Sequence, residues 1–198
     1  GYLTSYKESS HAVLRAYGKF LGSRYKNDPN IIWVLGGDAD PATLVYPKLV
    51  DLAEGIKSED HSHLMTFEAC RYSKGEAVTG GGDSSLDVWP KPPIWLDLNW
   101  VYQTTPTVRS GALKNYSRSP WLPPLMGEDW YELEHSTTEL QIRQEGYEAI
   151  LGGSYVGRIF GNNAIWSFNS ATAQTARNPT WQSQFVSVGP VGLSTIGI

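Results

Sequence analysis

Apolar residues recur at a helical spacing near the start of the chain. In residues 11–25 they occupy positions i, i+1, i+4, i+7 and i+8, namely Val13, Leu14, Tyr17, Phe20 and Leu21. This spacing places them on one face and predicts a helix over the segment. Residues 27–30 (NDPN) end the pattern, and the continuous apolar run of residues 31–35 (IIWVL) predicts a short strand that is covered on both faces.

Further helices and strands are predicted along the rest of the chain. Residues 44–56 have the pattern of a second amphipathic helix. The segment from Ser136 to Glu139 (STTE) has the form of a capping box and predicts a third helix, which stops at Gly152 and Gly153. Short apolar runs predict four more strands, over residues 63–69, 94–99, 123–128 and 164–168.

The alternation of strands and helices predicts an α/β fold with a parallel sheet. About five strands are expected, whereas a (β/α)8 barrel of the TIM-barrel type has eight strands and typically about 250 residues. We therefore expect an N-terminally truncated barrel with about strands 4 to 8, in which residues 1–170 form the partial barrel domain and residues 171–198 its C-terminal tail. The opening GYLTSYKESS, without a start methionine, also suggests a fragment. A doubly wound sheet is the alternative, although LGGDADP (residues 35–41) lacks the third glycine of a dinucleotide-binding turn.

Composition and charge narrow the class of partner. The chain has 198 residues, 40% of them hydrophobic, with eight Trp and eleven Tyr, so it can bury a sizeable core. The formal net charge is −4 with scattered Lys and Arg, and no apolar run approaches the roughly 20 residues of a membrane span, so we expect neither nucleic acid nor a membrane as a partner. The lone Cys70 excludes an internal disulfide and a Cys-based zinc site. We expect no cofactor and a neutral, sugar-like ligand.

Acidic residues occur at equivalent places in four of the predicted strands. The residues that end these apolar runs or lie within them are Asp38, Glu68, Asp97 and Glu128. In a barrel the catalytic groups lie at the carboxyl ends of the strands. Interleaved with these acids are Trp33, Trp95, Trp100, Trp130 and Trp166. Sugar rings stack on Trp while their hydroxyls bond to carboxylates, Asn and Gln, so the pattern predicts an acidic, aromatic-lined cleft for carbohydrate.

Five stretches of the chain together resemble a known family: NIIWVLGGDADP, DHSHLMTFEA, IWLDLNWVYQT, PPLMGEDWYE and IRQEGYEAILGGSYVGRIFGNNAIWSF. In this order they are similar to the apiosidase-like glycoside hydrolases, and the resemblance covers residues 17 to about 170. It implies a (β/α)8 barrel whose activity is the retaining hydrolysis of glycosidic bonds in plant polysaccharides, including bonds to apiose. It also favours a secreted or periplasmic location.

The resemblance implies roles for two carboxylates and a set of residues that bind substrate. Asp38 matches the acid/base after the fourth strand of the barrel, and Glu128 matches the nucleophile after the seventh. This agrees with the chemistry, because glycoside hydrolysis needs one carboxyl group to protonate the leaving oxygen and another to attack or stabilise the oxocarbenium-like centre. Glu68 stands where the family usually carries His, which predicts a changed sugar preference. The residues expected to bind substrate are Trp33, Glu68, Asp97, Asn99, Gln103, Trp130, Tyr131, Glu132 and Trp166.

Other hypotheses remain open at this point. The chain could be a non-catalytic carbohydrate-binding domain or a degenerate barrel fragment that keeps the aromatic cleft. A metal-dependent hydrolase would need a His or Asp cluster at the strand tops, whereas His61 and His63 precede their apolar run, so we expect no metal site. The strand at residues 31–36 would lack a third strand to pair with, and such an exposed edge predicts self-association.

Overall fold

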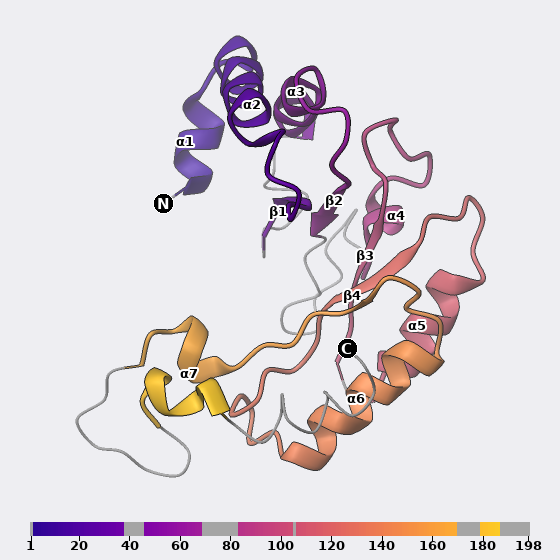
Figure 1. Cartoon of the computed structure of the whole chain (residues 1–198). Helices are drawn as coiled ribbons and strands as arrows, with labels where there is room; N and C mark the ends of the chain where they lie inside the picture. Colours follow the sequence, from indigo (N-terminus) through magenta and orange to yellow (C-terminus); the bar gives the residue numbers. More distant parts are fainter. Residues whose placement is uncertain (1, 38–45, 69–82, 105, 170–178, 187–198) are drawn as a thin grey trace. The chain divides into compact units, whose positions relative to one another are not determined.

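The computed structural model describes residues 2–37, 46–68, 83–104, 106–169 and 179–186 (Figure 1). The chain divides into two compact units, residues 1–100 and residues 101–198. Within each unit parallel strands combine with helices, which confirms the predicted α/β class. None of the helices in these described ranges has the length and the apolar composition of a membrane span.

The first unit contains the helices α1 (Tyr2–Glu8), α2 (His11–Tyr25) and α3 (Tyr46–Lys57), and a strand lies between α2 and α3 in the chain. The bounds of α2 confirm the predicted helix, which begins after Ser10 because the Ser10 side chain accepts a hydrogen bond from the backbone N–H of Val13. Its expected apolar face is only partly buried. Leu14 is buried, but Val13, Tyr17 and Phe20 are about half exposed.

Glycines explain this difference between the expected and the observed face of α2. The buried face of the helix contains Gly18 and Gly22, and a Cβ added at Gly18 would lie 2.3 Å from the carbonyl oxygen of Leu52 in α3. On the α3 side, a Cβ at Gly55 would lie 2.4 Å from the carbonyl oxygen of Arg15. The two helices therefore pack backbone to backbone, and the larger apolar side chains of α2 point elsewhere.

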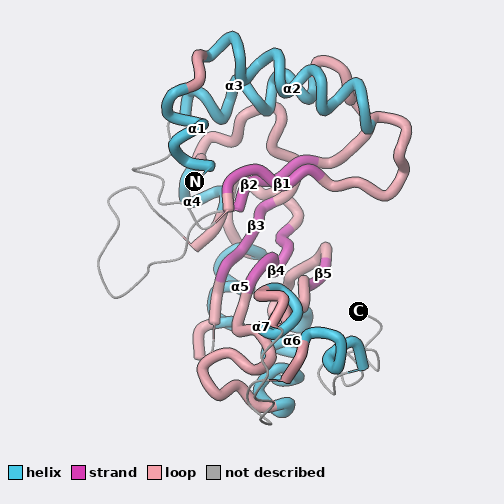
Figure 2. Tube along the Cα trace, turned by 90° about the vertical axis from the view of Figure 1, so that its left-hand side faces the viewer, coloured by secondary structure: helices cyan, strands magenta, loops and turns pink. Residues whose placement is uncertain are grey.

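Two parallel strands form the sheet of the first unit, β1 (Trp33–Gly36) and β2 (Met65–Glu68). Their register pairs Trp33 with Met65 at the amino ends and Gly36 with Glu68 at the carboxyl ends. The helices α2 and α3 lie on one side of these strands (Figure 2). The parallel pairing confirms the prediction for these two strands, although Leu64, which belongs to the predicted strand at residues 63–69, lies just before β2 and is 45% exposed.

The predicted strand at residues 94–99 is wrong in position. Residues 94–98 form a turn and an extended segment in which the backbone N–H of Leu96 donates to the carbonyl of Pro93, at 3.0 Å. Trp95, Leu96 and Leu98 are buried, so the apolar run fills the core without being a strand. The short helix α4 (Ser85–Val88) precedes this run, and the strand β3 (Asn99–Tyr102) begins where the run ends.

The second unit begins within β3 and contains the rest of the sheet β3-β4-β5, in which β4 (Pro124–Glu128) pairs in parallel with β5 (Gly157–Arg158). The helix α5 (Val108–Tyr116) packs on β4, and α6 (Glu139–Leu151) packs on α5 and β5. The buried residues of this core are Val101, Val108, Ala112, Met126 and Ala149. The helix predicted after the capping box is confirmed, with the box itself formed by Thr138 and Gln141.

Helix α7 (Asn163–Trp166) and the 3-10 helix η1 (Trp181–Val186) follow β5. The predicted strand at residues 164–168 is therefore wrong. Asn162 explains the helix, because its side-chain oxygen accepts hydrogen bonds from the backbone N–H groups of Ala164 and Ile165 and so caps a helical turn. The predicted tail, residues 171–198, lies mostly outside the described residues.

Candidate active site

In the first unit, the carboxyl ends of β1 and β2 bring a glycine turn beside an acid. Gly36 and Gly37 both have positive φ, and a Cβ at Gly36 would lie 2.7 Å from the carbonyl oxygen of Glu68. Only glycine meets both conditions. The half-buried Glu68 ends β2 beside this turn. The predicted acid/base Asp38 follows directly but lies outside the described residues.

Ser85 joins the carboxyl end of β2 to the amino end of β3. Its buried hydroxyl donates to the carbonyl oxygen of Phe67 at 2.6 Å and accepts from the backbone N–H of Trp100 at 2.9 Å. Asn99 supports the same region, since its Oδ1 accepts from the backbone N–H of Leu86 at 3.0 Å. Asn99 is fully buried, so its contribution here is to hold the backbone at Leu86 in place.

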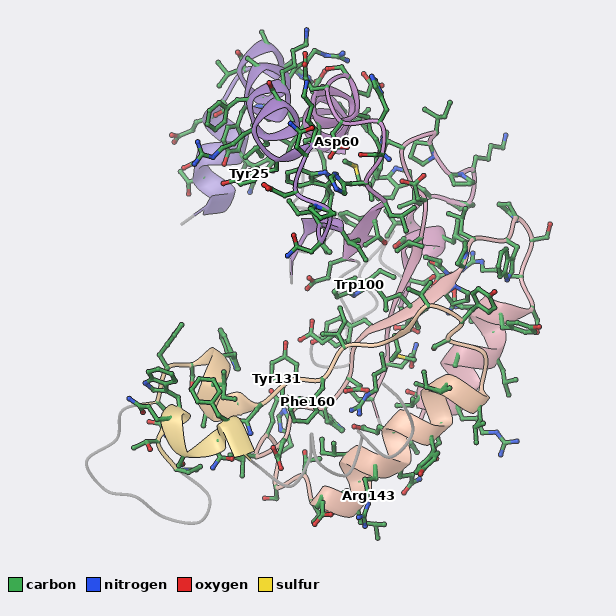
Figure 3. All side chains as sticks on the ribbon, viewed as in Figure 1. Tyr25, Asp60, Trp100, Tyr131, Arg143 and Phe160 are labelled. Carbon is green, nitrogen blue, oxygen red and sulfur yellow. The ribbon has the colours of Figure 1, made fainter. Side chains whose placement is uncertain are left out.

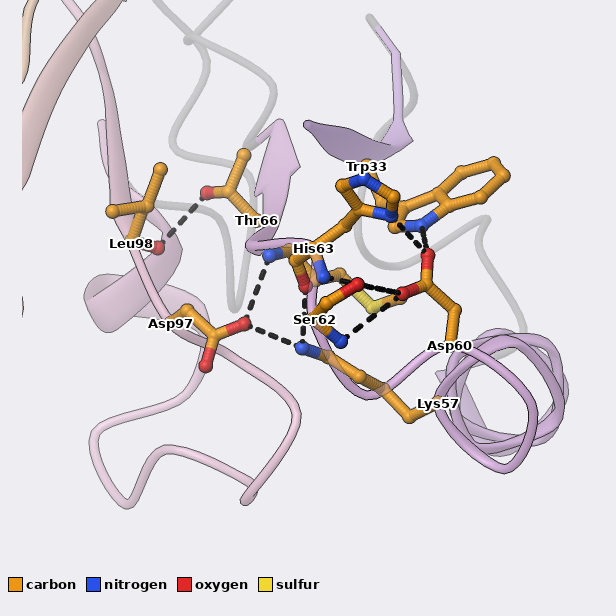
Figure 4. A network of polar contacts seen from close by, with 9 residues as sticks. Trp33, Lys57, Asp60, Ser62, His63, Thr66, Asp97 and Leu98 are labelled. Carbon is orange, nitrogen blue, oxygen red and sulfur yellow. Dashed lines mark hydrogen bonds and ion pairs between the residues drawn. The ribbon is translucent and has the colours of Figure 1, made fainter. Parts of the chain in front are cut away.

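The amino ends of the strands hold a second polar cluster (Figure 4). The Asp60 carboxylate accepts from the indole Nε1 of Trp33 at 2.8 Å, from both donors of Ser62 at 3.1 Å, and from the backbone and Nδ1 of His63 at 3.1 and 2.6 Å. Burial alone would raise the pKa of Asp60, but these hydrogen bonds outweigh it and hold the pKa well below its usual range. Asp60 therefore clamps the start of β1.

Asp97 extends this amino-end cluster. Its Oδ2 accepts from Lys57 Nζ at 2.8 Å and from the backbone N–H of Met65 at 2.9 Å. Trp33 and Asp97 thus lie at the amino ends of β1 and β2, whereas Glu68 lies at the carboxyl end. Trp33 and Asp97 therefore do not lie at the same end of the sheet as Glu68. Trp33 is the first residue of β1, and Asp97 bonds Met65, the first residue of β2.

A shallow pocket of about 430 Å³ lies near this amino-end cluster, lined by Glu54, Lys57, Ser58, His61, Ile94 and Trp95. His61 is exposed here, while His63 is buried against Asp60. The two histidines of this pair therefore lie in different environments. Among the described residues, no group of three or more His, Cys, Asp and Glu side chains is arranged to hold a metal ion.

In the second unit, Glu128 is the last residue of β4 and is half buried. Its carbonyl oxygen accepts from the backbone N–H of Gln103, at 3.1 Å. Gln103 itself is buried, with its Oε1 accepting from the hydroxyl of Thr107 at 2.7 Å. The predicted nucleophile therefore lies at the carboxyl end of a strand as expected, and Gln103 supports it from the neighbouring chain segment.

A buried ionic triad, formed by Asp129, Arg158 and Glu145, begins at the residue that follows β4. Arg158 donates from Nε and Nη2 to the two carboxylate oxygens of Asp129, and its Nη2 lies 3.6 Å from Oε2 of Glu145. All three side chains are almost fully buried. Burial raises the pKa of Asp129 to about 7, with the Arg158 charge opposing the rise and the Glu145 charge adding to it.

The loops after β4 and β5 are joined by Asn162. Its side-chain amide donates to Oε2 of Glu132 at 2.8 Å and to Oε1 of Gln184 at 3.3 Å. The backbones of these loops are also paired, because Glu132 donates to Gly161 and accepts from Asn163. Glu132 is buried in this arrangement, so it holds the two loops together.

Three aromatic residues near these loops remain accessible. Trp130 and Tyr131 follow Glu128 and are half buried, and the ring of Tyr131 packs where a Cβ at Gly161 would stand; Figure 3 labels Tyr131 together with Phe160 in these loops. Trp166 is 64% exposed, and its indole Nε1 is fixed by Oδ1 of Asn163 at 3.0 Å. A fixed, exposed indole can offer its face to a sugar ring.

Comparison with known protein families identifies the family of this chain. The profile described as the apiosidase-like catalytic domain matches residues 3–192. The chain belongs to this family. None of the proteins with curated functions matches it. The apiosidase-like resemblance inferred from the sequence motifs is thus confirmed.

Solved structures of glycoside hydrolases share the fold of this apiosidase-like chain. A family 5 glycoside hydrolase from Bacteroides vulgatus matches with a TM-score of 0.77 and 23% identity, over 95% of this chain and 44% of the other. A second structure, described as a glycoside hydrolase, matches with a TM-score of 0.74 and 25% identity, over 94% of this chain and 46% of the other. The chain therefore spans less than half the length of these structures, and its α/β fold is consistent with part of a TIM-barrel-like fold.

Two features of the site were not expected from the sequence. The Asp129–Arg158 pair joins residues that are 29 positions apart, and charged residues at such a separation give no local signal. Asn162 did carry a signal, because an Asn directly before a short apolar segment is typical of a helix N-cap. The capping interpretation would have replaced the predicted strand at residues 164–168.

Proposed function

We propose that this apiosidase-like chain carries the two catalytic carboxylates of a retaining glycosidase that acts on plant-type polysaccharides or oligosaccharides. The observation that carries the proposal is the position of Glu128, a half-buried carboxylate at the carboxyl end of a parallel strand within a glycosidase-family domain. In such folds the carboxyl ends of the strands supply the catalytic groups.

In this proposal the two carboxylates act in turn. Asp38 protonates the glycosidic oxygen as the leaving group departs, while Glu128 attacks the anomeric carbon and forms a glycosyl ester. Asp38, now deprotonated, then removes a proton from water, which displaces Glu128 and releases the sugar with its anomeric configuration retained. Each carboxylate ends the cycle in its starting protonation state.

Substrate contacts are assigned to accessible side chains. We assign Glu68 to bind a sugar hydroxyl, and Trp130, Tyr131 and Trp166 to stack on sugar rings. Three other predicted binding residues, Asn99, Gln103 and Glu132, are buried and bonded to protein groups, so in this proposal they support the walls of the site. Trp33 and Asp97 belong to the amino-end cluster, and in this proposal they make no contact with the substrate.

The proposal is tested by incubating the chain with a panel of aryl glycosides and plant cell-wall oligosaccharides, including apiose-containing ones, and measuring the sugars released. We expect wild-type hydrolysis of at least one compound and a loss of at least about a thousand-fold in the Glu128→Gln variant. The matched control is Glu139→Gln, which changes an exposed carboxylate on α6 and should leave the rate unchanged.

Two outcomes would contradict the proposal. Unchanged hydrolysis by the Glu128→Gln variant would remove the nucleophile assignment. Binding of an oligosaccharide by the wild-type chain without hydrolysis would instead support the alternative of a non-catalytic carbohydrate-binding fragment. Isothermal titration with the same oligosaccharides separates these cases.

A further inference from the structure

The backbone pairing between β4 and β5 stops just before Glu128. The register pairs Leu125 with Gly157 and Met126 with Arg158, and the last backbone bond runs from Ile159 N–H to the carbonyl of Met126, at 2.9 Å. In the described part of the chain, backbone pairing on this side resumes only at Glu132. The end of β4 that carries Glu128 is therefore held on this side by something other than a sheet ladder.

The Asp129–Arg158 pair fills this gap. Asp129 directly follows Glu128, and its side chain is fully buried, whereas Glu128 is half buried. The two donors of Arg158 reach both oxygens of Asp129 and so link the end of β4 to β5. A bidentate pair fixes orientation as well as distance.

Helix α6 completes the arrangement. Arg158 Nη1 donates to the carbonyl oxygen of Ile142 at 3.1 Å, and Nη2 lies 3.6 Å from the carboxylate of Glu145. One guanidinium therefore contacts both β4 and α6 while its own backbone belongs to β5. A lysine could not make these contacts together, because it lacks the planar fork of donors.

We infer that the buried triad of Asp129, Arg158 and Glu145 positions Glu128 for nucleophilic attack, by fixing the carboxyl end of β4 against β5 and α6. This inference rests on the proposed function, in which Glu128 is the nucleophile. Burying three ionisable groups is costly, and well-packed apolar residues would often give equal stability, so a gain in positioning accounts for the cost. A displacement of about 1 Å at a reacting group can lower a rate by about 10²-fold.

The test compares Arg158→Lys with the matched control Arg143→Lys, which makes the same chemical change in an exposed ion pair on α6; Figure 3 labels Arg143. Hydrogen exchange of both variants is measured by mass spectrometry. In Arg158→Lys we expect the exchange of amides 127–132 to rise at least about ten-fold, with the amides of residues 11–25 unchanged. The control should match the wild-type chain throughout.

The same variants are assayed on the compound that the wild-type chain hydrolyses fastest. We expect kcat of Arg158→Lys to fall about 10- to 100-fold while KM stays within about two-fold, because the variant changes the geometry of attack and leaves the sugar contacts in place. If circular dichroism shows that Arg158→Lys does not fold, Glu145→Gln replaces it, since this variant keeps the fork and should give the same pattern on a smaller scale.

Three results would overturn the inference: unchanged exchange at residues 127–132, a uniform rise over residues 101–169, or a local rise with unchanged kcat. The second result would mean that the triad serves only general stability. A wild-type chain that hydrolyses nothing contradicts the proposed function and removes the catalytic part of the inference. In that case the exchange data still decide whether the triad holds the end of β4.

Discussion

Glu68 is the residue for which the sequence analysis predicts a changed sugar preference. It ends β2 beside the Gly36 turn and is half buried. We expect Glu68→Gln to raise KM several-fold or to change the order of preferred sugars, with kcat within about three-fold, since the residue is assigned to binding. Steady-state kinetics on the aryl glycoside panel measure both constants. A loss of kcat as deep as that of Glu128→Gln would mean that Glu68 is a reacting carboxylate.

Asp60 makes the first unit sensitive to acid. Because hydrogen bonds hold its folded-state pKa below the usual value, its contribution to stability is complete above about pH 4 and is lost as the pH falls further. We expect Asp60→Asn to lower the free energy of unfolding by about 2–4 kcal/mol at neutral pH and to flatten its decline in acid. Urea unfolding at several pH values tests this, with the exposed Asp28→Asn as control. A decline as steep as in the wild-type chain would contradict the assignment.

At the scale of single residues, the sequence shows which acids lie next to an apolar run, but it does not show at which end of a strand each acid lies. Glu128 ends an apolar run, and the structure places it at the end of β4. Asp97 has the same local appearance, but the strand begins after it, so its carboxylate meets Lys57 and the backbone of Met65. Which end of a strand an acid occupies depends on where pairing begins, and tertiary contacts decide that.

At the scale of elements, close packing of glycines joins α2 to α3. Alanine is a better helix former than glycine by about 1 kcal/mol, yet a Cβ at Gly18 would meet the backbone of α3. We therefore expect Gly18→Ala to lower the unfolding free energy by about 1–3 kcal/mol. Thermal unfolding measures the change, and Ser23→Ala on the exposed side of α2 is the control. A stabilised Gly18→Ala variant would show that the helices are not in backbone contact.

The predicted elements succeeded where a local pattern and tertiary packing agree. The helix at residues 11–25 and the strands at 31–35, 63–69 and 123–128 are close to the observed bounds. Strand β5 was missed, because Gly157 and Arg158 form a strand of two residues with no apolar run. The run at residues 94–98 was assigned to a strand because its apolar residues suggested burial. Trp95, Leu96 and Leu98 are indeed buried, but they do not pair as a strand.

At the scale of the whole molecule, we propose that the edge of β1 promotes self-association. Among the described residues β1 pairs with β2 alone, and its side chain Val34 is 43% exposed. An exposed apolar edge strand favours pairing with another copy. We expect sedimentation velocity to show dimers that increase with concentration and decrease in Val34→Lys. Ile94→Lys, which changes a fully exposed apolar residue elsewhere in the first unit, is the control. Equal loss of dimers in both variants, or a monomer at all concentrations, would contradict the proposal.

The central claim is that Glu128 forms a covalent bond with the sugar during turnover. The most direct test is mass spectrometry of the chain quenched in acid during hydrolysis of an activated aryl glycoside. We predict a mass increase of one glycosyl residue, located by proteolysis on the peptide that contains Glu128, and absent from Glu128→Gln. A glycosyl group on another carboxylate, such as Glu68, or turnover that releases a sugar of inverted configuration without any adduct, would contradict the account.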